Sequence, residues 1–267
     1  MAFNMANSRV DKLPVPKKYM GVWQRQLLET STIRDESSTV FWMQSQFHHI
    51  DIRIPISLNQ LRSVNTLDDY NNEELLLLAE QQGFAGITKV TQHQTLLGQA
   101  ISKQSNVDKD IRLDVCEWLR EIDYQPASEC SDKCRDISEM NFTDANTVIE
   151  TGIDAQYLEI WRRLDGSEQP VTHQFITGIN RHAEYLPASL IRAGKFVAFA
   201  RPRTITLPNA ESLIQANQTF KPNREALLDW LDMEISFGEA LNENEWQIKY
   251  STMPFKKNLI LNFKPKI

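Results

Sequence analysis

The chain has 267 residues, of which 41% are hydrophobic, and its 29 basic and 35 acidic side chains give a formal net charge of −6. This composition excludes a disordered chain, because it supplies enough apolar material for one large core or two small ones. The acidic balance argues against a nucleic-acid partner, since proteins that bind nucleic acids show a basic footprint. No apolar run has the length of a signal peptide or of a membrane span, so no membrane partner is expected.

Segments that alternate apolar and polar residues at period two predict strands, so the chain is expected to be mainly β. In chain order, the predicted strands cover residues 21–28, 39–46, 48–54, 84–92, 112–124, 147–151, 157–164, 171–178, 195–201, 232–237, 246–251 and 259–263. Two predicted helices interrupt this pattern. The first, at residues 73–82, has Asn71 and Asn72 as candidate N-caps and ends at Gly83. The second, at residues 224–230, begins after Pro222 and Asn223.

The predicted elements carry landmarks that recur in the same order in two parts of the chain. The first series is Trp23-Gln24-Arg25, the segment 51–55, the helix ending near Gln82, a strand and Glu117-Trp118. The second series is Trp161-Arg162-Arg163, the segment 198–202, the helix at 224–230, a strand and Glu245-Trp246. In both series a proline follows the late tryptophan, at Pro126 and Pro254. This order predicts an internal duplication, with an N-terminal tail at residues 1–18 and two domains at 19–140 and 141–267.

A domain of this size, made of antiparallel strands with one inserted helix, is typical of a small up-and-down barrel or half-barrel. The predicted fold class is therefore mainly β, with two tandem antiparallel barrels or half-barrels that each carry a short helix.

The three cysteines, Cys116, Cys130 and Cys134, form an odd and sparse set that predicts no disulfide framework and favours reduced thiols in the cytoplasm. Cys130 and Cys134 lie in a polar stretch without a second Cys/His pair at ligand spacing, which predicts an exposed loop and no metal site. The histidines show no HxH or HExxH spacing, and the sequence identifies no cofactor.

Gly21-Val22-Trp23 resembles the glycine-x-tryptophan opening of lipocalin-like (calycin) barrels, in which the tryptophan plugs the closed end. Most of the chain resembles the fungal proteins described as interactors of the Hrr casein kinase, whose fold is a tandem of two lipocalin-like domains. The residues that carry this likeness are Phe84-Ala85-Gly86, Trp118 with Glu121 and Asp123, the segment 150–152 leading to 157–161, the segment 194–199, and the segment 235–238 before Trp246. The resemblance implies two lipocalin-like domains and no established chemistry.

Several predicted strands place aromatic and charged side chains on the same face. Polar strand faces usually point to water, but a ligand cavity also combines aromatic walls with a few convergent polar groups. An arginine held by a carboxylate beside a tryptophan is suited to a planar anionic group. The candidate ligand-binding residues are Trp23, Arg25, Trp42, Gln44, His49, Asp51, Arg53, Glu159, Trp161 and Arg163.

These residues favour a binding protein that holds a small anionic or aromatic ligand in a barrel cavity. In a first alternative, the barrels are filled and the chain is a protein-interaction or scaffold module with a protein partner on its outside. In a second, the chain is an enzyme on a calycin-like barrel that uses His49 and Asp51 as an oriented general base. The sequence contains no recognisable nucleophile motif or phosphate-binding glycine loop, so no catalytic residue is assigned.

Overall fold

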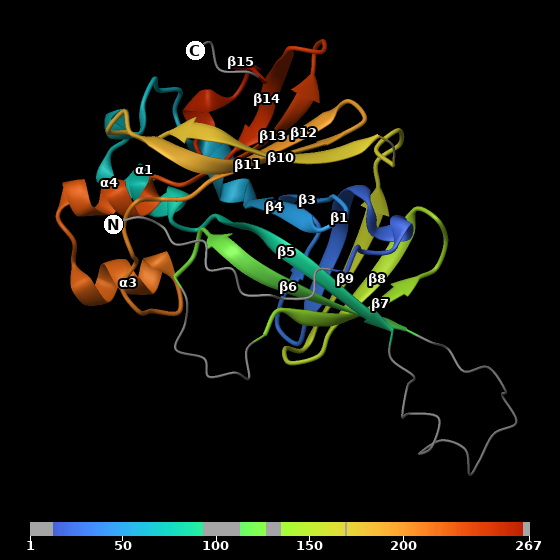
Figure 1. Cartoon of the computed structure of the whole chain (residues 1–267). Coiled ribbons are helices and arrows are strands. Elements are labelled where there is room, and N and C mark those ends of the chain that lie inside the picture. The colour runs from blue at the N-terminus through green and yellow to red at the C-terminus, as the bar shows by residue number, and fades with distance from the viewer. Residues whose placement is uncertain (1–12, 93–112, 127–134, 169, 264–267) are drawn as a thin grey trace, which may run out of the picture.

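The computed structural model describes residues 13–92, 113–126, 135–168 and 170–263, which form two antiparallel sheets (Figure 1). The first sheet contains β1 (Gly21–Thr30), β2 (Arg34–Asp35), β3 (Thr39–Gln44), β4 (His48–Ile54), β5 (Gln82–Gln92), β6 (Asp114–Asp123), β7 (Ile137–Phe142), β8 (Thr147–Gly152) and β9 (Tyr157–Arg163). The second contains β10 (Val171–Ile179), β11 (Tyr185–Ala193), β12 (Phe196–Arg201), β13 (Glu234–Ala240), β14 (Glu245–Ser251) and β15 (Ile260–Asn262). The predicted class, mainly β with two antiparallel barrels or half-barrels, is confirmed, since the first sheet is a closed barrel and the second a half-barrel.

The first sheet closes into a barrel of eight strands because β1 pairs with β9 as well as with β3. Along this seam the register runs from Trp23 opposite Arg163 to Thr30 opposite Tyr157, with a bulge between Arg25 and Leu27. The short strand β2 pairs with the end of β1 and stands outside the closed ring. Closure gives each strand of the ring two neighbours and separates an interior face from an outer face.

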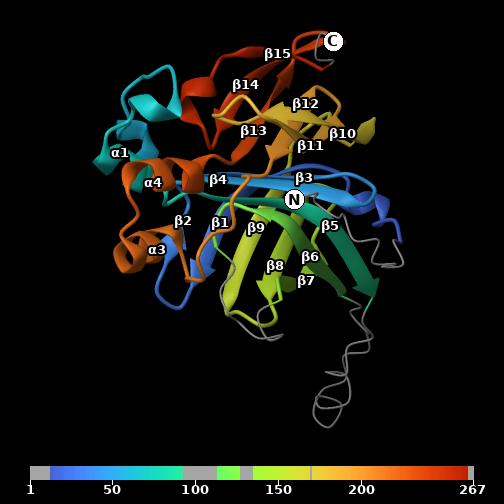
Figure 2. The same cartoon turned by 60° about the vertical axis from the view of Figure 1, so that its left-hand side comes forward.

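The second sheet keeps its six strands in chain order and curls into a half-barrel. Short helices lie in the connections of both sheets. They are η1 (Lys17–Tyr19) before β1, η2 (Ile56–Gln60), η3 (Leu67–Asp69) and α1 (Asn72–Leu78) between β4 and β5, α3 (Leu213–Phe220) and α4 (Arg224–Leu231) between β12 and β13, and η4 (Pro254–Lys256) after β14. Figures 1 and 2 show α1, α3 and α4 gathered on one side of the molecule, and α1 contacts α4.

The second sheet repeats the order of six barrel strands, β1 and β3 to β7. In both sheets a helical connection follows the third of these strands, which is β4 in the barrel and β12 in the second sheet. The next two strands then pair with a bulge, at Gly86 between β5 and β6 and at Gly238 between β13 and β14. A Cβ atom on either glycine would lie 1.9 Å from a carbonyl oxygen of the neighbouring strand, so the close approach requires glycine. Two residues after each glycine, Thr88 lies opposite Trp118 and Ala240 lies opposite Trp246. The two tryptophans therefore occupy equivalent positions, as the predicted repeat requires.

The predicted repeat differs from the structure at its first landmark. Trp161, which the repeat aligns with Trp23, lies on β9 of the barrel, whereas β10 takes the place of β1 in the second sheet. The predicted boundary after residue 140 falls within β7, and the change of sheet comes between Arg163 and Val171. The barrel extends further along the chain because β7, β8 and β9 complete its ring.

Strand β4 of the barrel is buried on both of its faces. Ile50 and Ile52 face outwards and pack in the core between the sheets, which also contains Ile235 of β13. His49 and Asp51 lie on the opposite face and are buried inside the barrel. The polar face of this strand therefore points into a second interior and not to water.

The N-caps of both predicted helices are confirmed, although one helix is shorter than predicted. The side chain of Asn71 accepts a hydrogen bond of 2.9 Å from the Glu74 amide, and Asn223 caps α4 with a bond of 2.9 Å to the Ala226 amide. The prediction that the first helix reaches Gln82 and ends at Gly83 is wrong, because both residues belong to β5. A Cβ atom on Gly83 would lie 2.8 Å from the carbonyl oxygen of Asp51. Glycine at this position therefore allows β5 to approach β4 closely.

The sequence did not predict the strands β2, β7 and β11, the helix α3 or the four short helices η1 to η4. Strand β11 contains Pro187, which argues against a strand when the residues are considered alone. Of the predicted cysteine features, Cys116 is a buried free thiol, whereas Cys130, Cys134 and the first twelve residues of the predicted tail lie outside the described residues.

Replacing Gly86 or Gly238 with alanine is expected to destabilise the protein by about 1–3 kcal/mol, because the new methyl group must displace a neighbouring backbone carbonyl. Urea denaturation measures the free energy of unfolding. Gly166→Asn is a suitable control, since Gly166 has a φ of +77° with no atom within 4 Å of a built Cβ, and asparagine tolerates this conformation. Wild-type stability in both alanine variants would contradict the close approach at the two bulges.

Candidate functional site

The predicted ligand-binding residues all come from four neighbouring barrel strands, β9, β1, β3 and β4. All of them except Arg53 are buried. They share the interior because alternate residues of adjacent strands point to the same side of a sheet. The sequence pattern therefore grouped side chains that the structure brings together, from strands that are far apart in the chain.

One end of the barrel is closed by Trp23 beneath the η1 turn. The Trp23 indole nitrogen donates a hydrogen bond of 2.8 Å to the carbonyl oxygen of Tyr19. The guanidinium of Arg163 lies 4.4 Å from the centre of a Trp23 ring and donates to the carbonyl oxygens of Lys18 and Met20. These contacts fasten the N-terminal turn to the barrel, so Arg163 here has a structural partner and is not free for a ligand.

The middle of the barrel contains a chain of neutral polar groups. Gln44 Oε1 accepts hydrogen bonds from the Trp42 indole at 3.2 Å and from the Thr88 hydroxyl at 2.7 Å. Because the Thr88 hydrogen points to Gln44, its oxygen accepts from Nδ1–H of His49 at 3.0 Å, which leaves His49 Nε2 unprotonated and without a partner. Burial, with a further contribution from Arg120, lowers the pKa of His49 well below its usual value and keeps the imidazole neutral.

His49 and Asp51 do not form an oriented acid–base pair. His49 bonds to Thr88, whereas the Asp51 carboxylate accepts a bond of 2.8 Å from Arg53. Burial raises the pKa of Asp51, and the adjacent Arg53 opposes this rise. The hypothesis of an enzyme that uses these two residues together therefore finds no support in their geometry.

The other end of the barrel holds a network of ion pairs around Glu159. Glu159 Oε1 accepts from Arg25 at 2.8 Å and from Arg53 at 3.2 Å, while Arg25 also donates to Asp35 at 2.6 Å. Arg120 stacks over the Phe84 ring at 3.7 Å and pairs with Asp136 at 2.7 Å. The network connects β1, β4 and β9, so the charges that a ligand would need are already used within the protein.

Glu150 is the buried carboxyl group beside this network. Its oxygens lie 2.9 Å from the Trp161 indole nitrogen, 2.8 Å from the Tyr157 hydroxyl and 3.0 Å from the Ser138 hydroxyl. Burial, followed by repulsion from Glu159, raises the pKa of Glu150 to about 8. Glu150 thus carries its proton near neutral pH, which lowers the charge inside the barrel.

The space left inside the barrel is small. A cavity of about 10 Å³ remains, and this corresponds to roughly one water molecule. Its lining is formed by Trp42, Asp51, Arg53, Phe84, Trp118, Asp136, Glu150 and Trp161. The aromatic and charged residues that suggested a ligand cavity therefore fill the barrel and pair with one another.

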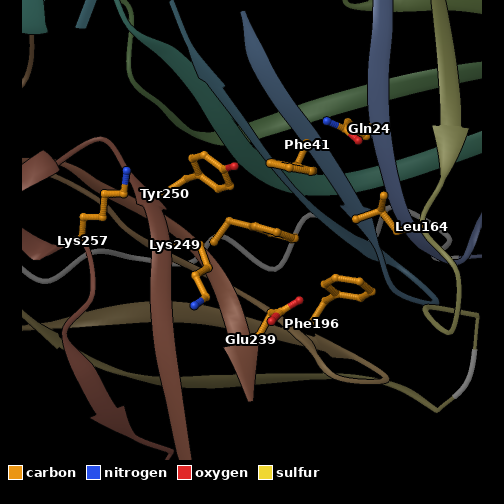
Figure 3. A pocket seen from close by; sticks show the side chains of 9 residues that line it. Gln24, Phe41, Leu164, Phe196, Glu239, Lys249, Tyr250 and Lys257 are labelled. Carbon is orange, nitrogen blue, oxygen red and sulfur yellow. The ribbon is translucent and has the colours of Figure 1, made fainter. Parts of the chain in front are cut away.

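A larger cavity, of about 440 Å³, lies between the barrel and the second sheet (Figure 3). We call it the inter-sheet cleft, and its lining consists of Gln24, Phe41, Leu164, Phe196, Phe237, Glu239, Lys249, Tyr250 and Lys257. Phe41 of β3 and Phe237 of β13 stack in parallel with ring centres 4.3 Å apart. The ring of Phe196 lies 5.9 Å from Phe237, and that of Tyr250 lies 5.3 Å from Phe41. Aromatic rings from both sheets thus form a continuous wall.

The polar groups of the inter-sheet cleft come mainly from the second sheet. Lys249 donates a hydrogen bond of 2.5 Å to Gln247, and Glu239 pairs with Lys195 at 2.9 Å. Within the described part of the chain, the Lys257 ammonium and the Tyr250 hydroxyl have no hydrogen-bond partner. The cleft therefore offers an aromatic wall with two ammonium groups, one of which is unpaired.

None of the cleft residues was among the predicted site residues. The predicted site residues lie on strand faces that combine tryptophan with charge, and these faces point into the barrel. Phe41, Phe196 and Phe237 lie on apolar faces that suggest ordinary core packing. Only the meeting of two sheets places their rings beside Lys249 and Lys257.

In the described residues, no cluster of His, Cys, Asp or Glu is arranged to hold a metal ion. None of the helices in this part of the chain has the length and apolar character that crossing a membrane requires.

No protein-family model matches the chain, and no curated protein matches its sequence. Among solved structures, an uncharacterised protein from Saccharomyces cerevisiae resembles it with a TM-score of 0.49 and 12% sequence identity. The match covers 86% of this chain and 84% of that chain. A likeness at this level carries no inference, so the function is inferred from the chain's own residues.

Glu150→Gln is expected to flatten the pH dependence of stability between about pH 5 and 8. In the wild type, unfolding releases the Glu150 proton in this window, because the folded pKa of about 8 exceeds the unfolded value of 4.5. Stability therefore falls as pH rises, by roughly 3–4 kcal/mol across this window. Urea denaturation at several pH values measures the free energy of unfolding of wild type and variant. His49 is present in both proteins, so its own contribution to the pH dependence cancels in the difference between them. Parallel pH curves would show that Glu150 does not hold the proton.

Proposed function

We propose that this chain is a binding protein for a small anionic molecule with an aromatic or other apolar body, held in the inter-sheet cleft. The observation that carries the proposal is the juxtaposition of the stacked Phe41 and Phe237 rings with Lys249 and Lys257 around one cavity. Ligand sites are typically concave and apolar, with a few polar groups that fix orientation. The cleft has this composition, and its ligand class is the one that the sequence favoured.

The volumes favour the cleft over the barrel as the ligand site. Small-molecule pockets usually measure about 300–1,000 Å³, and the cleft, at about 440 Å³, falls in this range, whereas the barrel cavity holds about 10 Å³. A ligand in the barrel would have to displace buried tryptophans and break the ion pairs of Glu159. A ligand in the cleft displaces only solvent.

The charges of the cleft favour an anion. Glu239 is neutralised by Lys195, which leaves Lys249 and Lys257 as the cations of the lining. The chain as a whole carries a net charge of −6, so a general basic excess does not account for these two lysines. An anionic group beside the ammonium groups of the lining, with its apolar body against Phe41 and Phe237, satisfies both halves of the lining.

We also propose that the chain is a lipocalin-like protein of the cytoplasm. Trp23 at the closed end of the barrel supports membership of the lipocalin-like proteins, in which a tryptophan plugs that end. The cytoplasm remains the proposed compartment because the sparse and odd set of cysteines favours reduced thiols.

Binding of 8-anilino-1-naphthalenesulfonate, an aromatic anion, tests the proposal by fluorescence titration. We expect Lys249→Gln and Lys257→Gln to weaken its binding by about threefold to tenfold each, because each removes a charge-assisted contact. N-phenyl-1-naphthylamine, which lacks the sulfonate, is expected to bind the wild type and both variants equally. The anion is also expected to raise the melting temperature, as a ligand of the folded state does.

Lys17→Gln is the matched control, since Lys17 is exposed on η1 and lies outside the cleft. Its affinity for the sulfonate should equal that of the wild type. The proposal would be overturned by equal sulfonate binding in the wild type and in the variant that lacks both cleft lysines, or by no binding to the wild type.

A protein-interaction module is the second candidate function, and the filled barrel is the observation that favours it. It predicts a stoichiometric partner that binds again when both proteins are purified, with no melting shift across a library of metabolites. A ligand that stabilises the protein and competes with the sulfonate would decide against it.

A further inference from the structure

Strand β10 forms one edge of the second sheet. It spans nine residues, pairs with β11 without a register shift, and has no strand on its other side in the described part of the chain. In the barrel, the corresponding strand β1 is covered on that side by β9. The second sheet repeats the strand order of the barrel but lacks a covering strand of this kind.

The edge of β10 carries none of the usual protections against another strand. Exposed edges are normally short, bulged, or marked by lysine or proline, because unpaired amide and carbonyl groups pair readily with a second chain. Strand β10 (VTHQFITGI) contains no proline and no Lys, Arg, Asp or Glu. Phe175 and Ile179 are 57% and 50% exposed on it. By contrast, β15 at the opposite edge has only three residues.

We propose that β10 pairs antiparallel with β10 of a second copy of this chain, which joins the two half-barrels into one continuous sheet. A two-fold axis at Phe175 places Phe175 opposite its own copy, and no cross-strand pair then contains Lys, Arg, Asp or Glu. The pairs are Val171 with Ile179, Thr172 with Gly178, His173 with Thr177, Gln174 with Ile176, and Phe175 with Phe175. Apolar residues meet apolar residues at the centre and at both ends of one face, which is the side-chain pairing that stabilises sheets.

The two-fold arrangement uses the same strand on both copies, so the assembly closes as a dimer and does not extend into a fibre. Tyr185, which is 75% exposed and lies opposite Ile179 on β11, adds apolar surface beside the ends of the seam. None of the residues of β10 lines the inter-sheet cleft, so the dimer and the proposed ligand site are independent.

Sedimentation equilibrium of the full chain tests the dimer. The wild type is expected to dimerise at concentrations up to about 100 µM, and Phe175→Lys and Thr177→Lys are expected to raise the dissociation constant at least about tenfold. Leu241→Lys is the matched control, because Leu241 is 51% exposed on the turn after β13 and lies outside the seam. Circular dichroism melting of each variant verifies that it folds. A monomeric wild type, or a dimer unchanged in both β10 variants, would overturn the proposal.

Cysteine cross-linking with copper phenanthroline as oxidant tests the register, in a chain whose Cys130 and Cys134 are replaced by serine. Phe175→Cys is expected to give a covalent dimer, because each residue 175 faces its own copy. Thr177→Cys is expected to give none, since its two copies lie roughly 13 Å apart along the strands and a disulfide needs Cα atoms within about 7 Å. Cross-linking through residue 177 without cross-linking through residue 175 would exclude the proposed register.

Discussion

The pairing of β1 with β9 is the interaction on which the rest of the structure depends, because it turns the first sheet into a closed ring. Glu159 of β9 reinforces this seam by binding Arg25 of β1, and it also binds Arg53 of β4. Once the ring closes, these charges share a confined interior with four tryptophans. Buried charges must be paired, so closure itself commits the arginines and carboxylates to one another. A barrel built in this way has a packed interior with little room for a ligand.

Closure also decides where the two sheets meet. With tryptophans and charges inside the ring, the outer face of the barrel carries apolar residues such as Phe41 and Ile50, which pack against the second sheet. The second sheet turns the corresponding face towards the barrel, while Trp246 belongs to a separate small core on its other side. Two curved outer faces contact each other over only part of their area. The inter-sheet cleft lies where this contact ends, and its aromatic wall is the continuation of the shared core.

The same strand order thus leads to two outcomes. In the barrel, two further strands, β8 and β9, return the sheet to β1, whereas the second sheet stops at the short β15, which corresponds to β7. The glycine bulges at Gly86 and Gly238 bend both sheets at matching positions, so both have the curvature of a barrel wall. The difference lies in the number of strands available for closure. It explains why the barrel is complete within one chain while β10 retains an edge that fits another strand.

The sequence by itself determined the β class, the N-caps at Asn71 and Asn223, and the grouping of Trp23, Trp42, Asp51 and Trp161 with charged partners, because alternation and capping are local properties of the chain. It did not determine that the strand of Trp161 closes the first barrel, that the charged face of β4 points into a packed barrel interior, or that Phe41 stacks on Phe237. These features depend on which strand pairs with β1 and on which outer faces touch. Only the tertiary structure decides them, since they are contacts between segments that are distant in sequence and carry no local pattern.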